Sequence, residues 1–180
     1  MYPYLRYTKS IVDAVIANKK VQPLGFDEVN EVMVRSDNTH SNSVLEINIG
    51  RFLIHYDICI NYFISHKELA KQLFKNRCSM VVAGSTIQYR KRIRLFDKVK
   101  IKTQLVGMDE RWLYLEHSMW VKGKPCSSVL LRTGVTEGGK VIEMKRVLAA
   151  LGIEAWDKPT EPWIQDWIDS DKTHRWPPIG

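Results

Sequence analysis

The spacing of apolar residues changes near residue 78, and this change constrains the fold more than any other feature of the sequence. Across residues 49–64, apolar side chains recur at helical spacing and also occupy the other faces, as in a helix buried on most sides. Residues 66–76 predict a second, shorter helix. From residue 79 onward apolar and polar residues alternate, which is typical of β-strands. The chain is therefore expected to combine a buried helix with a sheet.

The strand-rich part contains four alternating runs joined by short turns. The runs cover residues 79–95, 98–106, 111–121 and 127–136. Short turns favour an antiparallel meander. A strand over 26–35 comes before the buried helix, and further helices are expected over 3–18 and 142–151. This order predicts an α+β domain in which a curved antiparallel sheet surrounds a central helix.

The length and composition fit one such domain with extensions. A chain of 180 residues with 44% hydrophobic residues can bury a single core. Three scattered cysteines match no zinc or redox spacing and exclude a disulfide scaffold. We assign residues 1–25 to an N-terminal helical segment, 26–152 to the domain, and 153–180 to an acidic extension rich in Trp and Pro.

The net charge of +7 is concentrated in one part of the chain. Residues 154–180 contain six acids and three bases, so residues 1–153 carry 24 − 14 = +10. No DNA- or RNA-binding motif accompanies this charge, which argues against a nucleic-acid partner. No uncharged apolar stretch of about 18 residues exists, and the first residues do not resemble a signal peptide. A cytoplasmic protein without a membrane span is expected.

Three segments resemble the thioesterase-like superfamily of hotdog-fold proteins, of the 4-hydroxybenzoyl-CoA thioesterase type. Residues 45–53 (LEINIGRFL) resemble its FHMNNGRYL segment, and residues 89–97 (YRKRIRLFD) resemble FRRSLRLFE. Residues 105–116 (LVGMDERWLYLE) resemble LLGWDDRWFYLE, a motif of the branch that includes thioesterase superfamily member six. The resemblance agrees with the predicted order of elements, because a hotdog sheet wraps around a central helix.

The resemblance implies a homodimer whose two sheets join edge to edge, with a tetramer as a further option. It also implies acyl-CoA thioesters bound at the subunit interface, no metal, and no cofactor beyond the CoA part of the substrate. In related enzymes an Asp before the central helix activates water or attacks the thioester. The helix N-terminus, marked here by Gly50, polarises the thioester carbonyl.

This chain departs from the family pattern at the catalytic position. The usual DxDxxxHMNN becomes HSNSVLEINI over residues 40–49, so that His40 and Asn42 replace the two acids. An Asn side chain cannot act as a general base. Glu46 is the best replacement acid, because it lies just before the helix in an apolar frame that can raise its pKa. The alternative for Glu46 is a helix-capping or solvent-facing carboxylate.

Each neighbouring polar residue has two interpretations. Asn42 and Asn48 orient a water molecule or hold the thioester, or else Asn48 caps the helix N-terminus. Asp37 and His40 form a base with its orienting carboxylate, or they only decorate a polar loop. The sequence leaves these alternatives open.

Basic residues alternate on two of the predicted strands. They are Arg90, Arg92 and Arg94 on the first strand, and Lys98, Lys100 and Lys102 on the second. Projecting from one face, they would bind the phosphates of coenzyme A, or they form a solvated outer face of the sheet. The aromatic side chains of Trp112, Tyr114 and Trp120 form either the wall of an acyl channel or part of the core.

The leading function is hydrolysis of an acyl-CoA thioester at a homodimer interface. Water would attack a carbonyl held at the Gly50 end of the helix, with Glu46 or the Asn42 loop assisting. The alternative is a hotdog protein that binds acyl-CoA or acyl chains without turning them over, because the usual Asp is Asn42 here. A dehydratase or isomerase is a third option, but the sequence shows no His-plus-acid signature typical of those enzymes.

Overall fold

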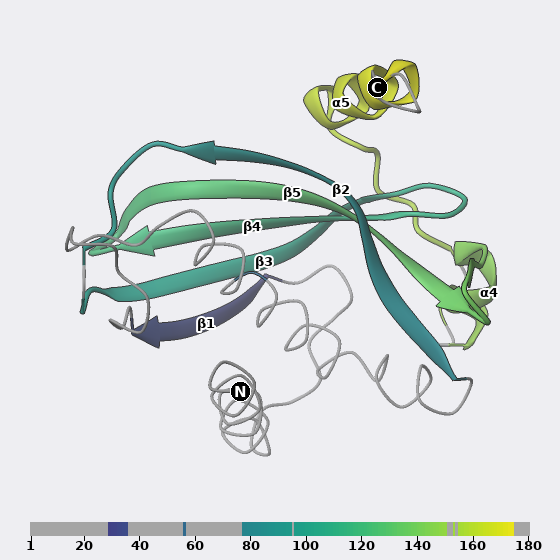
Figure 1. The fold of residues 1–180 in the computed structure, drawn as a ribbon, viewed down its shortest axis with the longest axis horizontal. Coiled ribbons are helices and arrows are strands. Elements are labelled where there is room, and N and C mark those ends of the chain that lie inside the picture. Colours follow the sequence, from purple (N-terminus) through teal and green to yellow (C-terminus); the bar gives the residue numbers. More distant parts are fainter. Residues whose placement is uncertain are drawn as a thin grey trace, which may run out of the picture.

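The structure is a computed structural model, and it describes residues 29–35, 56, 77–94, 96–150, 153 and 155–174. Figure 1 shows a curved sheet with a short helix at one end and a longer helix near the C-terminus. The strands are β1 (Asn30–Arg35), β2 (Cys78–Tyr89), β3 (Lys98–Met108), β4 (Leu113–Val121), β5 (Lys124–Glu137) and β6 (Lys140–Val141). The helices are α4 (Met144–Ala150) and α5 (Pro162–Thr173).

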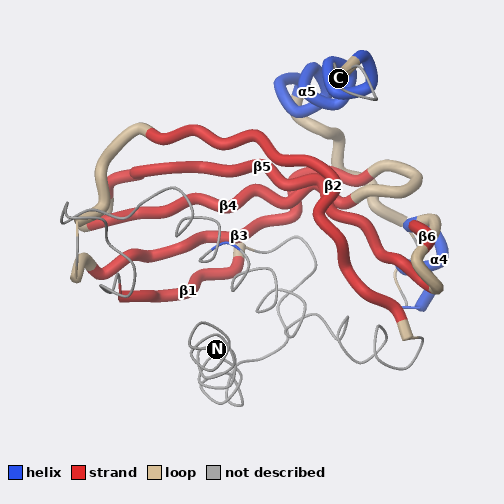
Figure 2. Tube along the Cα trace, viewed as in Figure 1, coloured by secondary structure: helices blue, strands red, loops and turns tan. Residues whose placement is uncertain are grey.

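The predicted α+β architecture is confirmed, and so are the strands that became β3, β4 and β5. The sheet order is β1-β3-β4-β5-β2, with β6 paired to β5, and all pairs are antiparallel (Figure 2). The helices predicted over 3–18, 49–64 and 66–76 lie outside the described residues, except for Tyr56, which is helical. β5 turns into β6 through Gly138 and Gly139, both at positive φ.

The predicted four-strand meander is wrong for its first strand. Both edges of β3 are occupied, because Ile101 lies opposite Val32 of β1 on one side and Met119 of β4 on the other. β2 therefore pairs with the far edge of β5, where Ile87 lies opposite Val129. The connection from β2 to β3 crosses the end of the sheet instead of forming a hairpin (Figure 2).

The core lies on one face of the sheet, which we call the inner face. Alternate residues of β3, β4 and β5 are buried there and pack against Tyr56. The cluster includes Val99, Ile101, Met119, Val129 and Leu131, and a second cluster joins Leu105, Leu113, Leu115 and Val135 to Met144 and Val147 of α4. Each large side chain buried in this way contributes about 1.5–3 kcal/mol.

The C-terminal helix α5 covers part of the opposite, outer face. Ile164 and Ile168 of α5 are buried against Tyr114 of β4 and Leu130 of β5. Ile164 and Ile168 can both face the sheet because residues four apart in the sequence lie on the same side of a helix. Pro162 stands in the first turn, where the absence of its N–H costs nothing. The described part of the extension thus packs on its own domain.

A stacked arginine fastens α5 to the sheet. The Arg132 guanidinium lies 5.3 Å from the ring centre of Trp112 and 5.8 Å from that of Trp167. It also forms an ion pair with Asp171 of α5. Trp112 in turn lies on Gly134, where any Cβ would come within 2.7 Å of the indole. The ion pair with Asp171, the stacked indole rings and the close approach of Trp112 to Gly134 therefore all lie around Arg132.

Replacing Asp171 with Ala is expected to lower the free energy of unfolding by about 2 kcal/mol, because Arg132, 17% exposed, would lose its counter-charge. Asp169→Ala is the matched control. Its carboxylate pairs with Lys172 on the solvent side of α5, so the loss should stay below about 0.5 kcal/mol. Urea denaturation of both variants measures the difference, and equal losses would contradict the anchoring role of Arg132.

Candidate functional site

The predicted catalytic residues Asn42, Glu46, Asn48 and Gly50 lie outside the described residues. Their roles stay predictions. Asp37 and His40 lie in the same undescribed part. The described residues form two clusters of polar side chains. One lies inside the core and the other on the outer face of the sheet.

A core polar cluster joins the central helical residue Tyr56 to the sheet. The Tyr56 hydroxyl and Ser127 Oγ are hydrogen-bonded at 2.9 Å, and Thr103 Oγ1 and His117 Nδ1 at 2.8 Å. The rings of Tyr56 and His117 lie 5.5 Å apart at 43°. All four residues are buried. Strand alternation places Thr103, His117 and Ser127 on the inner face, where Tyr56 packs.

His117 is held in its neutral form by its surroundings. Complete burial lowers the pKa of its imidazole to about 3, because the charged form loses hydration. Within the described part of the chain, His117 Nε2 has no hydrogen-bond partner. An imidazole with so low a pKa is a weak base near pH 7. The cluster is therefore suited to positioning: it fixes Tyr56, six residues beyond Gly50, against the sheet.

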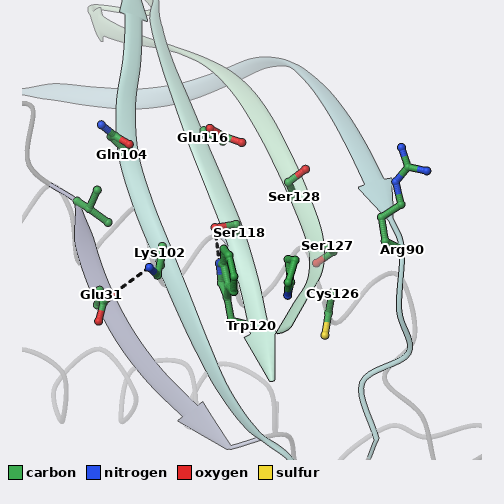
Figure 3. Close-up of a pocket in the computed structure, with 12 residues that line it drawn as sticks. Glu31, Arg90, Lys102, Gln104, Glu116, Ser118, Trp120, Cys126, Ser127 and Ser128 are labelled. Atoms are coloured by element: carbon green, nitrogen blue, oxygen red, sulfur yellow. Dashed lines mark hydrogen bonds and ion pairs between the residues drawn. The ribbon is translucent and has the colours of Figure 1, made fainter. Parts of the chain in front are cut away.

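The outer face contains a hollow of about 610 Å³. Figure 3 shows its side chains rising from β1, β3, β4 and β5. The lining includes Glu31, Lys102, Gln104, Glu116, Trp120 and Ser128. Lys102 Nζ lies 5.1 Å from the centre of the Trp120 ring, and Trp120 Nε1 donates to Ser118 Oγ at 2.9 Å. We call this site the outer hollow.

Two carboxylates of the outer hollow have opposite environments. Glu31 accepts a hydrogen bond from Lys100 at 2.9 Å and lies 3.3 Å from Lys102, and this contact with Lys100 holds its pKa below the usual range. Burial raises the pKa of Glu116, and the nearby Glu161 raises it further. Glu116 was not singled out from the sequence, although the alternation of β4 places it opposite the core-facing Leu115.

The predicted row of arginines on a strand is wrong. β2 ends at Tyr89, because the N–H groups of Arg90 and Lys91 both donate to the Cys126 carbonyl, at 2.8 and 2.9 Å, and end the ladder. Arg90, Arg92 and Arg94 are exposed in the connection that follows. Arg90 lines the outer hollow, where its guanidinium donates to Gln88 at 3.1 Å.

The lysine row does lie on one strand face. Lys98, Lys100 and Lys102 alternate with buried residues along β3 and face outward. Lys98 is exposed, whereas Lys100 and Lys102 share Glu31. Of the six basic residues predicted to bind CoA phosphates, Lys100 and Lys102 therefore have part of their charge compensated within the chain.

The aromatic row also lies on the outer face, away from Tyr56. Tyr114 is buried beneath α5 and donates to Asp109 at 2.6 Å, so it belongs to a core cluster. Burial and that hydrogen bond raise its pKa. Trp112 stacks on Arg132, and Trp120 lines the outer hollow. These positions agree with the core interpretation for Tyr114 and do not form an inner acyl channel.

The described residues contain no helix long and apolar enough to cross a membrane. In the same ranges, no group of three or more His, Cys, Asp or Glu side chains is arranged to hold a metal ion.

Comparisons with known proteins agree on one family. The model of the thioesterase-like superfamily matches residues 34–168. Protein THEM6 of Xenopus laevis is 24% identical over 163 residues, which cover 86% of this chain and 75% of the frog protein.

Solved structures share the fold at low sequence identity. A 1,4-dihydroxy-2-naphthoyl-CoA thioesterase from Synechocystis superposes with a TM-score of 0.60 at 7% identity, covering 73% of this chain and all of that one (100%). SAV2348 from Staphylococcus aureus, solved in complex with CoA, gives a TM-score of 0.58 at 10% identity, covering 77% of this chain and 93% of that one.

Proposed function

Because this chain belongs to the thioesterase-like superfamily and has its hotdog fold, we propose that it hydrolyses acyl-CoA thioesters at a homodimer interface. The observation that carries the proposal is the family match, which spans residues 34–168 and so includes the segment from Asn42 to Gly50. The CoA found with SAV2348 and the CoA ester named for the Synechocystis enzyme support the same substrate class. We assign the reaction to the cytoplasm.

The proposed chemistry is attack of water on a thioester carbonyl held at the Gly50 end of the central helix. Backbone N–H groups at a helix N-terminus stabilise the developing oxyanion. Glu46 takes the proton from the water, while Asn42 and Asn48 orient the water or hold the thioester. The C–S bond then breaks, and Glu46 returns its proton to the departing CoA sulfur, so that the CoA thiol and a carboxylic acid leave and the Glu46 carboxylate is restored. No metal, and no cofactor other than the CoA of the substrate, takes part.

The phosphates of CoA are assigned to Arg90, Arg92, Arg94, Lys98 and Lys100. Support comes from exposure, because all of them except the half-buried Lys100 are open to solvent at the same end of the sheet. Guanidinium groups suit phosphate because their donors match its oxygens in pairs. Lys100 should contribute least, since it already pairs with Glu31.

The homodimer is assigned to the β2 edge of the sheet. β2 is the last strand in the sheet order and has 12 residues. Val81 and Val82 on it are 37% and 50% exposed. A long edge strand with exposed apolar side chains is a ready template for pairing with another chain. Two copies joined there would extend one sheet into the other.

A panel of acyl-CoA esters tests the proposal. The expected result is release of free thiol at a rate proportional to protein concentration, from a species sedimenting at twice the 20.9 kDa chain mass. The alternative function, binding acyl-CoA or acyl chains without turnover, is favoured by Asn42 at the usual Asp position. Binding of an ester, measured by calorimetry, without thiol release would replace the hydrolase by this alternative.

A further inference from the structure

The connection from β2 to β3 carries an exposed phenylalanine on a strained backbone. Phe96 is 61% exposed and has φ +66°. The turn is closed on both sides of it: the Arg94 N–H donates to the Asp97 carboxylate at 2.9 Å, and the Asp97 N–H donates to the Arg94 carbonyl at 3.2 Å. A left-handed backbone at this position favours glycine. The ring therefore costs stability and is left largely in water.

The fixed end of the same connection explains why the ring stays outside. Ile93 is only 1% exposed and packs in the inner-face cluster. Phe96, three residues later, is not part of this cluster and is mostly exposed. A strained, exposed aromatic side chain points to a partner outside the chain, because most of the ring is left unburied.

Sheet topology surrounds Phe96 with positive charge. β2 and β4 end, and β3 and β5 begin, at the same end of the sheet (Figures 1 and 2, left). Seven exposed cations lie at or between these strand ends: Arg90, Lys91, Arg92, Arg94, Lys98, Lys122 and Lys124. Arg94 and Lys98 are two residues from Phe96, hence within about 7 Å along the backbone. We call this surface the basic end.

Among the described residues, the opposite end of the sheet is nearly balanced: its acids are Asp109, Glu110, Glu137 and Glu143, and its bases are Arg77, Arg111, Lys140, Lys145 and Arg146. Asp97 is the one acid among the described residues of the basic end. At the other end the turn after β3 contains Asp109, Glu110 and Arg111, and Glu137 of β5 pairs with Arg146 of α4. The positive charge is therefore polarised along the strands.

We propose that the basic end docks on an anionic lipid surface, with Phe96 inserted among the head groups. Cations near such a surface are attracted by its negative potential, and transfer of an apolar ring from water into the interface is favourable. The two signals together match what stable peripheral binding needs. Arg90, Arg92, Arg94 and Lys98 are also assigned to the CoA phosphates, whereas Lys91, Lys122 and Lys124 belong to the lipid-facing surface alone. The proposal does not rest on hydrolysis, but CoA and lipid would compete for the four shared side chains.

The test uses the full chain and vesicles of phosphatidylcholine with or without phosphatidylserine. Co-sedimentation should be seen only with phosphatidylserine and should weaken as salt is raised. Phe96→Gly should lower vesicle affinity about tenfold, by loss of the ring. The same variant should raise Tm by about 2 °C, because glycine relieves the strained φ. A variant that binds less yet melts higher cannot have lost binding through misfolding.

Two further variants separate charge from aromatic exposure. The double variant Lys122→Gln/Lys124→Gln should lose about fivefold in affinity for each cation removed. Trp163→Ala is the matched control, because Trp163 is 44% exposed on α5 and its indole N–H donates to the carboxylate of Glu161, and this variant should bind like the wild type.

Three outcomes would overturn the proposal. One is equal binding to vesicles with and without phosphatidylserine, and another is unchanged vesicle affinity in Phe96→Gly. The third is a halved sedimenting mass in Phe96→Gly, which would show that a second copy of the chain covers the ring.

Discussion

Glu46→Gln is expected to lower kcat/KM for acyl-CoA hydrolysis by about 10²–10⁴-fold, the usual contribution of a general base. The amide keeps the size and shape of the carboxylate but cannot accept the proton from the attacking water. The affinity for CoA should be retained, because the proposed phosphate ligands lie elsewhere in the chain. Thiol release and CoA binding, measured on the same preparation, separate the two effects.

The matched control for this experiment is Glu143→Gln. Glu143 is exposed next to α4, far along the chain from the proposed site, so turnover should match the wild type. If the Glu46→Gln variant turns over substrate as fast as the wild type, Glu46 is not the general base. The alternative interpretation of Glu46, as a helix-capping or solvent-facing carboxylate, would then hold.

The free energy of unfolding is expected to fall by about 2 kcal/mol between pH 6.5 and about pH 5, because of His117. Above pH 6.5 its imidazole is neutral in both folded and unfolded chains. Below that value the unfolded chain binds a proton, whereas the folded chain does not until the pH nears its lowered pKa of about 3. Stability is therefore lost as the pH falls through this window.

Urea denaturation at several pH values measures this slope directly. His117→Gln should flatten the slope between pH 6.5 and about pH 5, whatever its effect on stability at neutral pH. His174→Gln, at an exposed position just after α5, should keep the slope of the wild type. Carboxylates titrate mainly below this window, so they do not mask the result. Parallel slopes for the wild type and His117→Gln would contradict a buried neutral histidine.

The strands β3, β4 and β5 could be predicted because alternation is a local property. Each strand has one buried face, and the Lys122–Gly123 turn at positive φ joins β4 to β5 directly. The neighbour of β2 could not be predicted in this way, because it depends on which edges of β3 are already occupied. That information resides in β1, far away in the chain.

The candidate site divides along the same line. The outward lysines of β3 followed from alternation and Glu46 stays a prediction from family resemblance, whereas the core polar cluster gave no signal in the sequence. His117 looks like any inward position of β4, and its partners Thr103 and Tyr56 are 14 and 61 residues away. The helix α5 did have a signal, since Ile164, Trp167 and Ile168 recur at helical spacing.

The two edge strands of the described sheet differ in length, and in the proposed homodimer this difference limits how many chains can join. β1 offers six residues to a neighbour and β2 offers twelve. In the proposed homodimer, two copies related by a twofold axis through their β2 strands would use both long edges at once. The two strands left at the outer edges of such a pair would be the short β1 strands, which offer an incoming chain few hydrogen bonds. An assembly built on this rule terminates at a closed pair instead of polymerising into a fibre.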